Sequence, residues 1–195
     1  MPQFLFRYDQ ESGRWTTNYL IDGLLTTVRL SLWASLLALV AGFAVALARV
    51  SQSLYLRLLA RSFIELMRNL PPLVIIFLFY FFLADQLVPL ASMGRIDAES
   101  HPLLTRICTL LFAPPANLSP FLSALVTLAV FETAYMAEIV RSGIESVHKG
   151  QWEACHALGL SRWQCLRHII LPQSLRRVLP PLAGQLVSLI KDSSI

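Results

Sequence analysis

The residue with the clearest chemical consequence is Glu132, a carboxylate inside the apolar stretch of residues 121–140. A charge in a membrane-spanning helix costs roughly 2.5–3.5 kcal/mol on insertion scales, so such a side chain usually faces the protein interior or water. Glu132 could be the counter-charge of a cationic ligand, with Tyr135 one turn along the same face. It could instead carry a proton, or only hydrogen-bond to a neighbouring helix.

Motifs of enzymatic catalysis are missing from the chain. It has no phosphate-binding glycine loop, no dinucleotide fingerprint, no paired-histidine zinc motif and no nucleophile elbow. Any ATP that the protein uses must therefore be hydrolysed by a partner. We expect the chain not to be an enzyme and to hold no cofactor of its own.

The cysteines Cys108, Cys155 and Cys165 are too few and too scattered to predict a disulfide framework. His156 and His168 lie near two of them, which raises the question of a metal site. No pair has the tight spacing of zinc ligands, so we interpret the cysteines as small residues of helical segments and expect no metal.

The composition predicts a membrane protein built of helices. Of the 195 residues, 55% are apolar and 14% are charged, whereas a soluble domain carries about 25% charged residues. Residues 30–48 contain no charge, and about 20 apolar residues cross a bilayer as a helix. The net charge of +4 comes from basic residues at the ends of apolar blocks, so we do not expect nucleic acid as a partner.

Four apolar stretches predict spanning helices within a single transmembrane domain, residues 1–195. They cover about 18–48, 70–84, 121–140 and 179–190. The second and fourth begin at Pro71-Pro72 and Pro180-Pro181, and proline suits the first turn of a helix. Gly42 and its small neighbours favour close helix packing in the first stretch.

The distribution of Arg and Lys predicts the orientation in the membrane. The connections 49–69 and 141–177 are rich in basic residues, and such connections face the cytoplasm. The N-terminus and residues 85–120 should then face outward. The number of helices between these segments agrees with that arrangement.

The segment 150–172 resembles the EAA loop of ABC importer permeases, whose pattern is E-A-A-x3-G-x9-I-x-L-P. The residues that match it at the same spacings are Glu153, Ala154, Gly159, Ile169, Leu171 and Pro172. Cys155 stands where the second alanine is usual, and it is also small. Residues 63–71, 134–144 and 190–194 are similar to segments of the histidine, glutamine and glutamate permeases, so the resemblance covers roughly residues 20–195.

This resemblance implies an all-α, type I importer permease fold and a function in transport. Family members carry a fifth spanning helix after residues 191–194, where this chain shows four, so we expect a fragment or a truncated variant. The implied partners are an ATP-binding subunit, an extracytoplasmic solute-binding protein, a second permease subunit (identical or homologous), a polar amino acid and membrane lipid. The location implied is the bacterial inner membrane, with several crossings.

The implied mechanism is alternating access of a translocation pathway to the two sides of the membrane. The sequence does not say which amino acid is carried. Two alternatives stay open: a membrane anchor or assembly subunit without its own pathway, and an ion-driven amino-acid transporter.

The cytoplasmic loop of about residues 142–177 is implied to dock into the ATP-binding subunit. Residues 153–160 predict a short helix that Gly159 ends, and Ser161 is expected to cap a second helix. Pro172 is expected to end that helix. The side chains expected to form an apolar surface are Trp152, Ala154, Ala157, Leu158 and Leu160. Glu138 and Arg141 are expected to form an ion pair at the end of the third stretch.

Overall fold

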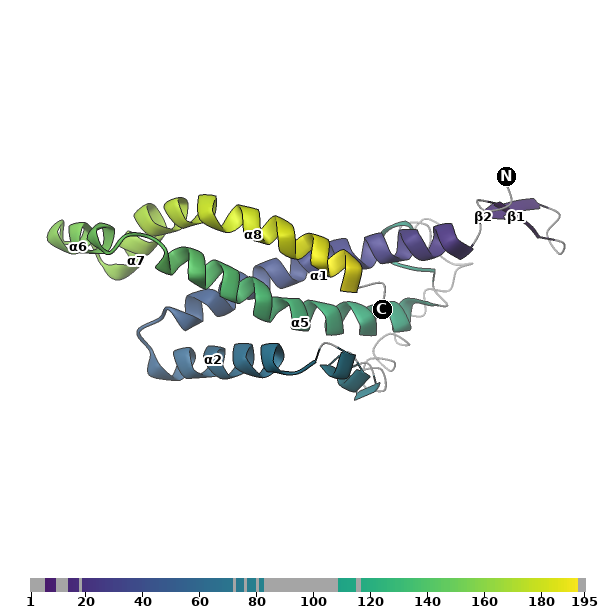
Figure 1. Ribbon diagram of the computed structural model, residues 1–195, viewed down its shortest axis with the longest axis horizontal. Coiled ribbons are helices and arrows are strands. Elements are labelled where there is room, and N and C mark those ends of the chain that lie inside the picture. Colours follow the sequence, from purple (N-terminus) through teal and green to yellow (C-terminus); the bar gives the residue numbers. More distant parts are fainter. Residues whose placement is uncertain are drawn as a thin grey trace, which may run out of the picture.

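The protein is a bundle of long helices in a computed structural model that describes residues 6–9, 14–17, 19–71, 73–75, 77–79, 81–82, 109–114 and 117–192. Its main elements are β1 (Phe6–Asp9), β2 (Arg14–Thr17), α1 (Tyr19–Arg49), α2 (Leu54–Asn69), α5 (Leu118–Glu145), α6 (Lys149–Ala157), α7 (Arg162–Cys165), the π-helical turn η3 (Leu166–Ile170) and α8 (Leu171–Asp192). In Figure 1, α1, α5 and α8 run lengthwise, with β1 and β2 at one end and α6 and α7 at the other.

The two short strands were not expected in an all-α chain. They pair antiparallel, with Phe6 opposite Thr17 and Asp9 opposite Arg14. The rest of the described chain outside turns and short loops is helical, so the helical class is confirmed and the hairpin is an addition to it.

Small residues form the contact between α1 and α5. Ala34, Ala38 and Ala46 are completely buried, and with Gly42 they recur every four residues along one face of α1. A Cβ atom at Gly42 would lie 2.9 Å from Met136 Cβ and 3.1 Å from the backbone nitrogen of Ala137. Small residues at this spacing let two helix backbones approach closely, as the sequence predicted for this segment.

Hydroxyl side chains in the two long helices bond to their own backbone. Thr26 and Ser31 in α1 each donate to the carbonyl four residues earlier, at 2.7 Å. Thr127 and Thr133 in α5 do the same at 2.7 and 2.6 Å. These bonds satisfy polar groups that would otherwise be costly in an apolar environment.

The connection after α1 contains a helix, α2, with one apolar face. Its buried residues Ala60, Ile64 and Met67 recur every three to four positions, which places them on a single face. Arg61 and Glu65 form an exposed ion pair at 2.6 Å. The helix packs against both α1 and α5, so residues 54–69 belong to the bundle and are not only a connection.

The expectation of four spanning helices is not confirmed. Among the described residues, Leu20–Arg49 and Leu118–Glu145 are long and apolar enough to cross a bilayer. A third crossing results if Leu54–Asn69 and Leu73–Phe79 are counted as one bent span. Part of the second predicted stretch lies outside the described residues.

The fourth predicted stretch begins earlier than expected. Helix α8 starts at Leu171, and Pro180 and Pro181 lie inside it. The two prolines therefore do not open a helix at residue 179. Proline removes a backbone donor from a helix interior, and here the helix continues through both prolines to Asp192.

Candidate functional site

The turn after α6 is fixed by its backbone hydrogen bonds. Gly159 has φ +71°, its N–H donates to the carbonyl of His156, and the N–H of Leu160 donates to the carbonyl of Cys155, both at 3.0 Å. These two bonds make a Schellman motif, which ends a helix with a left-handed residue that glycine adopts without strain. The predicted helix stop at Gly159 is confirmed.

The helix after this turn starts with a capping box. The hydroxyl of Ser161 accepts from the N–H of Gln164 at 3.3 Å, and the N–H of Ser161 donates to the side chain of Gln164 at 2.9 Å. The backbone N–H groups of Ser161 and Gln164, which have no partner within the helix, are both hydrogen-bonded in this way. The predicted cap at Ser161 is confirmed.

The expectation that Pro172 ends this helix is wrong. The N–H of Leu171 donates to the carbonyl of Leu166, five residues earlier, so the chain passes through one π-helical turn. It then continues directly as α8, in which Pro172 is the second residue. Proline lacks the N–H that a continuous α-helix would use at this position, and the π-helical turn before it accommodates the proline.

Residues 148–172, which we call the knob, share a core with the long helices. The buried residues of this core from the knob are Cys155, Cys165, Leu166 and Ile170. They pack with Ala46 of α1, Ile64 of α2, Val140 and Ile144 of α5 and Val178 of α8. The knob is therefore a fixed part of the bundle and not a solvated loop.

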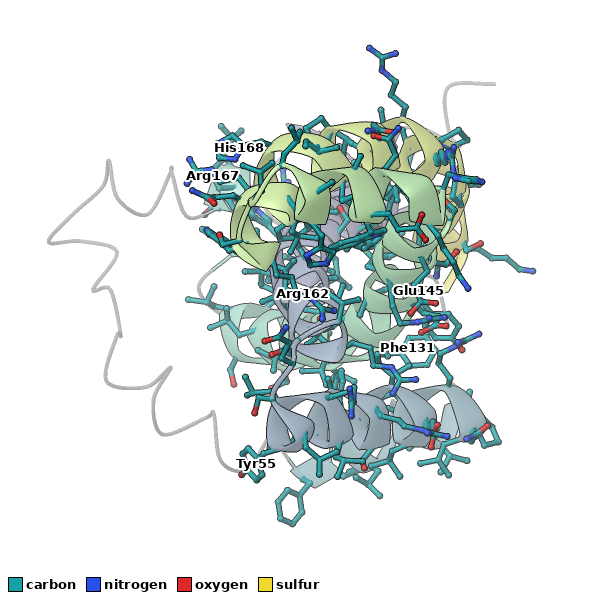
Figure 2. All side chains as sticks on the ribbon, turned by 90° about the vertical axis from the view of Figure 1, so that its left-hand side faces the viewer. Tyr55, Phe131, Glu145, Arg162, Arg167 and His168 are labelled. Atoms are coloured by element: carbon teal, nitrogen blue, oxygen red, sulfur yellow. A yellow bond between two sulfur atoms is a disulfide. The ribbon has the colours of Figure 1, made fainter. Side chains whose placement is uncertain are left out.

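Polar contacts also fasten the knob to its neighbours. Arg162 donates to the carbonyl of Val50, between α1 and α2, at 3.0 Å. Gln173 of α8 donates to the side chain of Gln151 in α6 at 3.2 Å. Figure 2 looks onto this end of the molecule, with Arg162 near the middle of the view. The knob thus has direct polar contacts to two separate parts of the chain, the junction of α1 and α2 and the start of α8.

The six residues that match the EAA pattern divide by exposure. Glu153, Ala154, Gly159 and Pro172 are exposed, whereas Ile169 and Leu171 pack against the shared core. The first group is available to a partner. The second group fixes the knob on the helices.

The expected apolar surface forms in part. Leu158 is 74% exposed, and Ala154 and Ala157 are exposed beside it in sequence. Trp152 and Leu160 instead pack against the core. Trp163, which lies outside the predicted surface, is 57% exposed and adds apolar surface on α7.

The structure pairs two cysteines that we had interpreted as scattered small residues. A disulfide joins Cys155 of α6 to Cys165 of α7, with Cα atoms 5.7 Å apart. The Gly159 turn reverses the chain and brings these positions together. Among the described residues, no cluster of three or more His, Cys, Asp or Glu side chains forms a candidate metal site.

Glu132 faces α8. Its side chain is completely buried, and Gln185 donates to its two carboxylate oxygens at 3.1 and 3.0 Å. Gln185 was not among the predicted site residues, although a polar amide in the apolar stretch 179–190 is a signal of the same kind as Glu132. Tyr135 packs against Phe131, and the guanidinium of Arg68 lies 5.7 Å from the Tyr135 ring. Glu132 and Tyr135 therefore contact different helices.

A cluster of charged side chains lies at the end of α5 nearest the knob. Arg141 bonds to both carboxylate oxygens of Glu138 at 2.9 and 2.5 Å, and it also pairs with Glu145. Arg68 of α2 lies 3.9 Å from the same Glu138 carboxylate. The predicted pair of Glu138 and Arg141 is confirmed, and the cluster also links α5 to α2.

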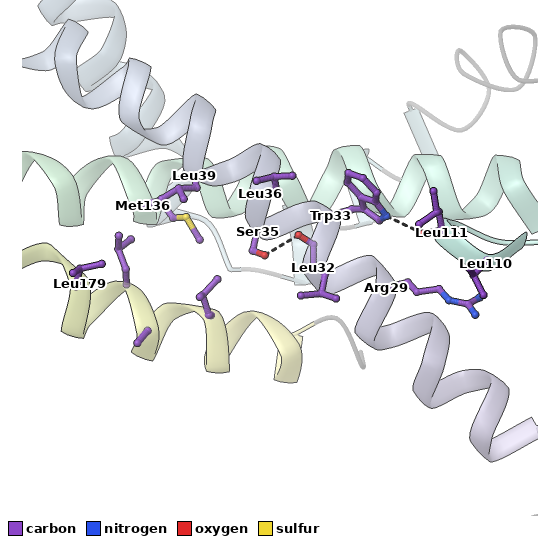
Figure 3. A pocket seen from close by; sticks show the side chains of 13 residues that line it. Arg29, Leu32, Trp33, Ser35, Leu36, Leu39, Leu110, Leu111, Met136 and Leu179 are labelled. Carbon is purple, nitrogen blue, oxygen red and sulfur yellow. Dashed lines mark hydrogen bonds between the residues drawn. The ribbon is translucent and has the colours of Figure 1, made fainter. Parts of the chain in front are cut away.

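A pocket of about 740 Å³ lies between α1, α5 and α8 (Figure 3). Leucines form most of its wall, with Arg29 and Trp33 among the other lining residues. A second pocket of about 370 Å³ lies nearer the knob and shares Leu39 and Leu182 with the first. Neither pocket is lined by Glu132 or Tyr135, and their apolar walls do not suit a polar ligand.

Residues 34–195 match the family model described as binding-protein-dependent transport system inner membrane component. This match covers residues 34–49 of α1, all of α2, α5 and α8, and the whole knob. It agrees with the resemblance that the EAA pattern suggested.

Relatives and a solved structure support the same family. The chain is 40% identical over 177 residues to the probable amino-acid ABC transporter permease protein YckA of Bacillus subtilis, covering 91% of this chain and 66% of that protein. It is 37% identical over 181 residues to the glutamine transport system permease protein GlnP of Escherichia coli, covering 90% and 68%. The chain thus spans about two thirds of the length of these relatives.

A crystal structure of an amino acid ABC transporter with histidines matches 91% of this chain and 74% of the solved chain. The TM-score is 0.65 and the sequence identity is 27%. The helix arrangement is therefore that of an ABC transporter membrane subunit.

Proposed function

Because the chain belongs to the family of binding-protein-dependent transport system inner membrane components, as a permease subunit of the amino-acid ABC importer class, we propose that its helices line a pathway for a polar amino acid. The pathway opens alternately to the two sides of a bacterial inner membrane. ATP is hydrolysed on a separate ATP-binding subunit. A solute-binding protein delivers the substrate from outside, and a second permease subunit, identical or homologous, completes the pathway.

The observation that carries this proposal is the construction of the knob. A flexible loop would lose much conformational freedom on binding, whereas a knob with a capped helix start, a fixed glycine turn and a buried core is ordered beforehand. Its exposed residues include Glu153 and Leu158. A groove on the ATP-binding subunit would bury the apolar side chain and offer Glu153 a charge-assisted hydrogen bond.

The contacts of the knob also suggest how closure of the ATP-binding subunits reaches the pathway. Arg162 holds the junction of α1 and α2, and Gln151 holds α8. Because Ile170 and Val178 share one core with α5, a displacement of the knob moves the ends of several helices together. Packed cores of this kind favour rigid-body movement.

We retain Glu132 as the counter-charge for the substrate's ammonium group. In the arrangement described here Gln185 covers the carboxylate, so a substrate reaches it only when α8 separates from α5. Tyr135 would then act from the α2 side of the same helix. Such a separation would fit alternating access, because the same two helices close the site and carry the knob.

The experiment that tests the proposal is reconstitution in lipid vesicles with the ATP-binding subunit, the solute-binding protein and the second permease subunit. Uptake of a labelled polar amino acid is expected only with all components and ATP. Uptake driven by a pH gradient without any ATPase would support the ion-driven alternative. Assembly of the complex with no uptake would support the anchor alternative.

A further inference from the structure

The cysteine pair lies where the knob's two short helices meet. Cys155 and Cys165 are separated by 10 positions in sequence, and the Gly159 turn lies between them. Both residues are buried, at 0% and 1% exposure. The disulfide therefore closes a ring that contains the whole turn, with Ala154 and Glu153 directly before it.

This bond fixes α6, the helix that carries the exposed docking residues. Besides the core packing of Cys155 and Trp152, the polar contacts of α6 lie near the surface: Gln151 accepts a hydrogen bond from Gln173 at 3.2 Å, and the Arg162 guanidinium lies 5.8 Å from the Trp152 ring. Exposed contacts of this kind contribute little to stability. Without the cross-link, α6 is held more loosely against α7.

We propose that Cys155 and Cys165 form a reversible thiol–disulfide site that sets how tightly the knob binds the ATP-binding subunit. The inference rests on the proposed function of the knob. The disulfide form presents Glu153 and Leu158 in one arrangement, so it loses less conformational freedom on docking than the dithiol form. Oxidation therefore strengthens docking, and reduction weakens it.

The chemistry is thiol–disulfide exchange with a low-molecular-weight disulfide such as glutathione disulfide. The thiolate of one cysteine attacks the oxidant and releases one thiol, and the second thiolate then displaces the other. The pair loses two electrons and two protons, and the oxidant becomes two thiols. In a reducing compartment such disulfides are usually transient or regulatory, which suits a knob on the ATPase side of the membrane.

Thermodynamic linkage between docking and oxidation of the cysteine pair provides a second measurement that tests the proposal. If the disulfide form binds the ATP-binding subunit more tightly by some factor, the bound subunit shifts the thiol–disulfide equilibrium by that same factor. A cross-link that leaves the affinity for the ATP-binding subunit unchanged would show no such shift, because the two equilibria are coupled only when the two redox forms bind with different affinity. The two readouts together separate a regulatory site from a structural one.

The test uses the reconstituted complex with Cys108→Ser, so that Cys155 and Cys165 are the only cysteines of the permease chain. The permease is equilibrated in glutathione buffers, and thiols are counted after denaturation by the gel shift of a maleimide polymer. Affinity for the ATP-binding subunit is measured in each buffer. We expect oxidation to tighten binding roughly fivefold or more, within the usual range of coupling between linked equilibria, and the redox midpoint to move when the subunit is present.

Cys155→Ala is the matched control, because it restores the alanine that the EAA pattern has at this position. Its affinity should be the same in every buffer and close to that of the reduced protein. Equal affinity of the oxidised and reduced pair, or failure of the pair to oxidise, would overturn the inference while leaving docking intact. Absence of binding in both redox states would instead overturn the proposed function, and this inference with it.

Discussion

Gly159 is the residue of the knob whose backbone limits substitution most. Its φ of +71° is strained for other residues, yet a Cβ there would meet no atom within 4 Å. A side chain at this position therefore costs conformational energy, and it points into open space where a partner would dock. Asn and Asp enter the left-handed region more readily than other side chains.

We predict that Gly159→Asp leaves membrane insertion intact but abolishes ATP-coupled uptake. The added charge would meet the docking groove, and the affinity of the ATP-binding subunit should fall roughly tenfold or more, which is about 1.4 kcal/mol. Co-purification of that subunit and stimulated ATP hydrolysis in vesicles measure the effect. Gly159→Asn, of equal size and similar backbone preference, is the control and should keep most of the activity. Normal association and hydrolysis in the Asp variant would remove the docking assignment.

A second prediction concerns the buried carboxylate. Glu132→Gln keeps the size of the side chain and one oxygen that accepts a hydrogen bond from Gln185, so the bundle should assemble normally. Loss of the charge removes the proposed partner of the substrate's ammonium group. We expect kcat/KM for uptake to fall about tenfold or the preference among amino acids to change.

Measured uptake kinetics for several amino acids decide between the two roles of Glu132. The control is co-purification with the ATP-binding subunit, which should be unchanged. If all kinetic constants match the unmodified protein, then Glu132 only joins α5 to α8 through Gln185.

At the scale of elements, the α1–α5 contact depends on a small residue at one position. Gly42→Leu should destabilise the protein by about 1–3 kcal/mol, because a larger side chain would overlap Met136 and the α5 backbone. Gly23→Leu in the same helix is the control, since a Cβ there meets no atom within 4 Å. Thermal unfolding in detergent measures both variants. Equal melting temperatures for the two would show that the close approach at Gly42 does not stabilise the bundle.

The helix start and the turn of the knob could be predicted because each depends on residues that are close together in the sequence. Ser161 and Gly159 act through neighbours within five residues, so a cap and a turn are recognisable in sequence. The predictions that Pro172 ends a helix and that Pro180 begins one are wrong, because proline disfavours the interior of a helix only on average. The π-helical turn before Pro172 accommodates the first, and tertiary packing of α8 outweighs the local preference at the second.

Contacts across the bundle could not be predicted in the same way. The partner of Glu132 is Gln185, 53 residues away, and its identity depends on how α8 lies against α5. The pairing of Cys155 with Cys165 depends on the Schellman turn between them. Separation of Glu132 from Tyr135 follows from α5 being covered by α8 on one side and by α2 on another, which periodicity alone does not reveal.

For the whole molecule, the arrangement of the ends gives the orientation a physical basis. The β1–β2 hairpin and the knob lie at opposite ends of the bundle (Figure 1). The knob end carries exposed basic residues, among them Arg162, Arg167 and Lys149. Basic residues next to spanning helices are retained on the cytoplasmic side, which is also where the ATP-binding subunit would be found.

The last prediction tests this orientation by labelling in intact cells. In a cysteine-free background, Lys149→Cys at the exposed start of α6 should resist a membrane-impermeant maleimide until the cells are opened. Ser92→Cys, in the connection predicted to face outward, should react in intact cells. Each variant must first retain uptake, so that its labelling reports the functional arrangement. Labelling of Lys149→Cys but not Ser92→Cys would reverse the topology. The knob would then lie on the side where no ATP-binding subunit can reach it, and the docking proposal would fail together with the orientation.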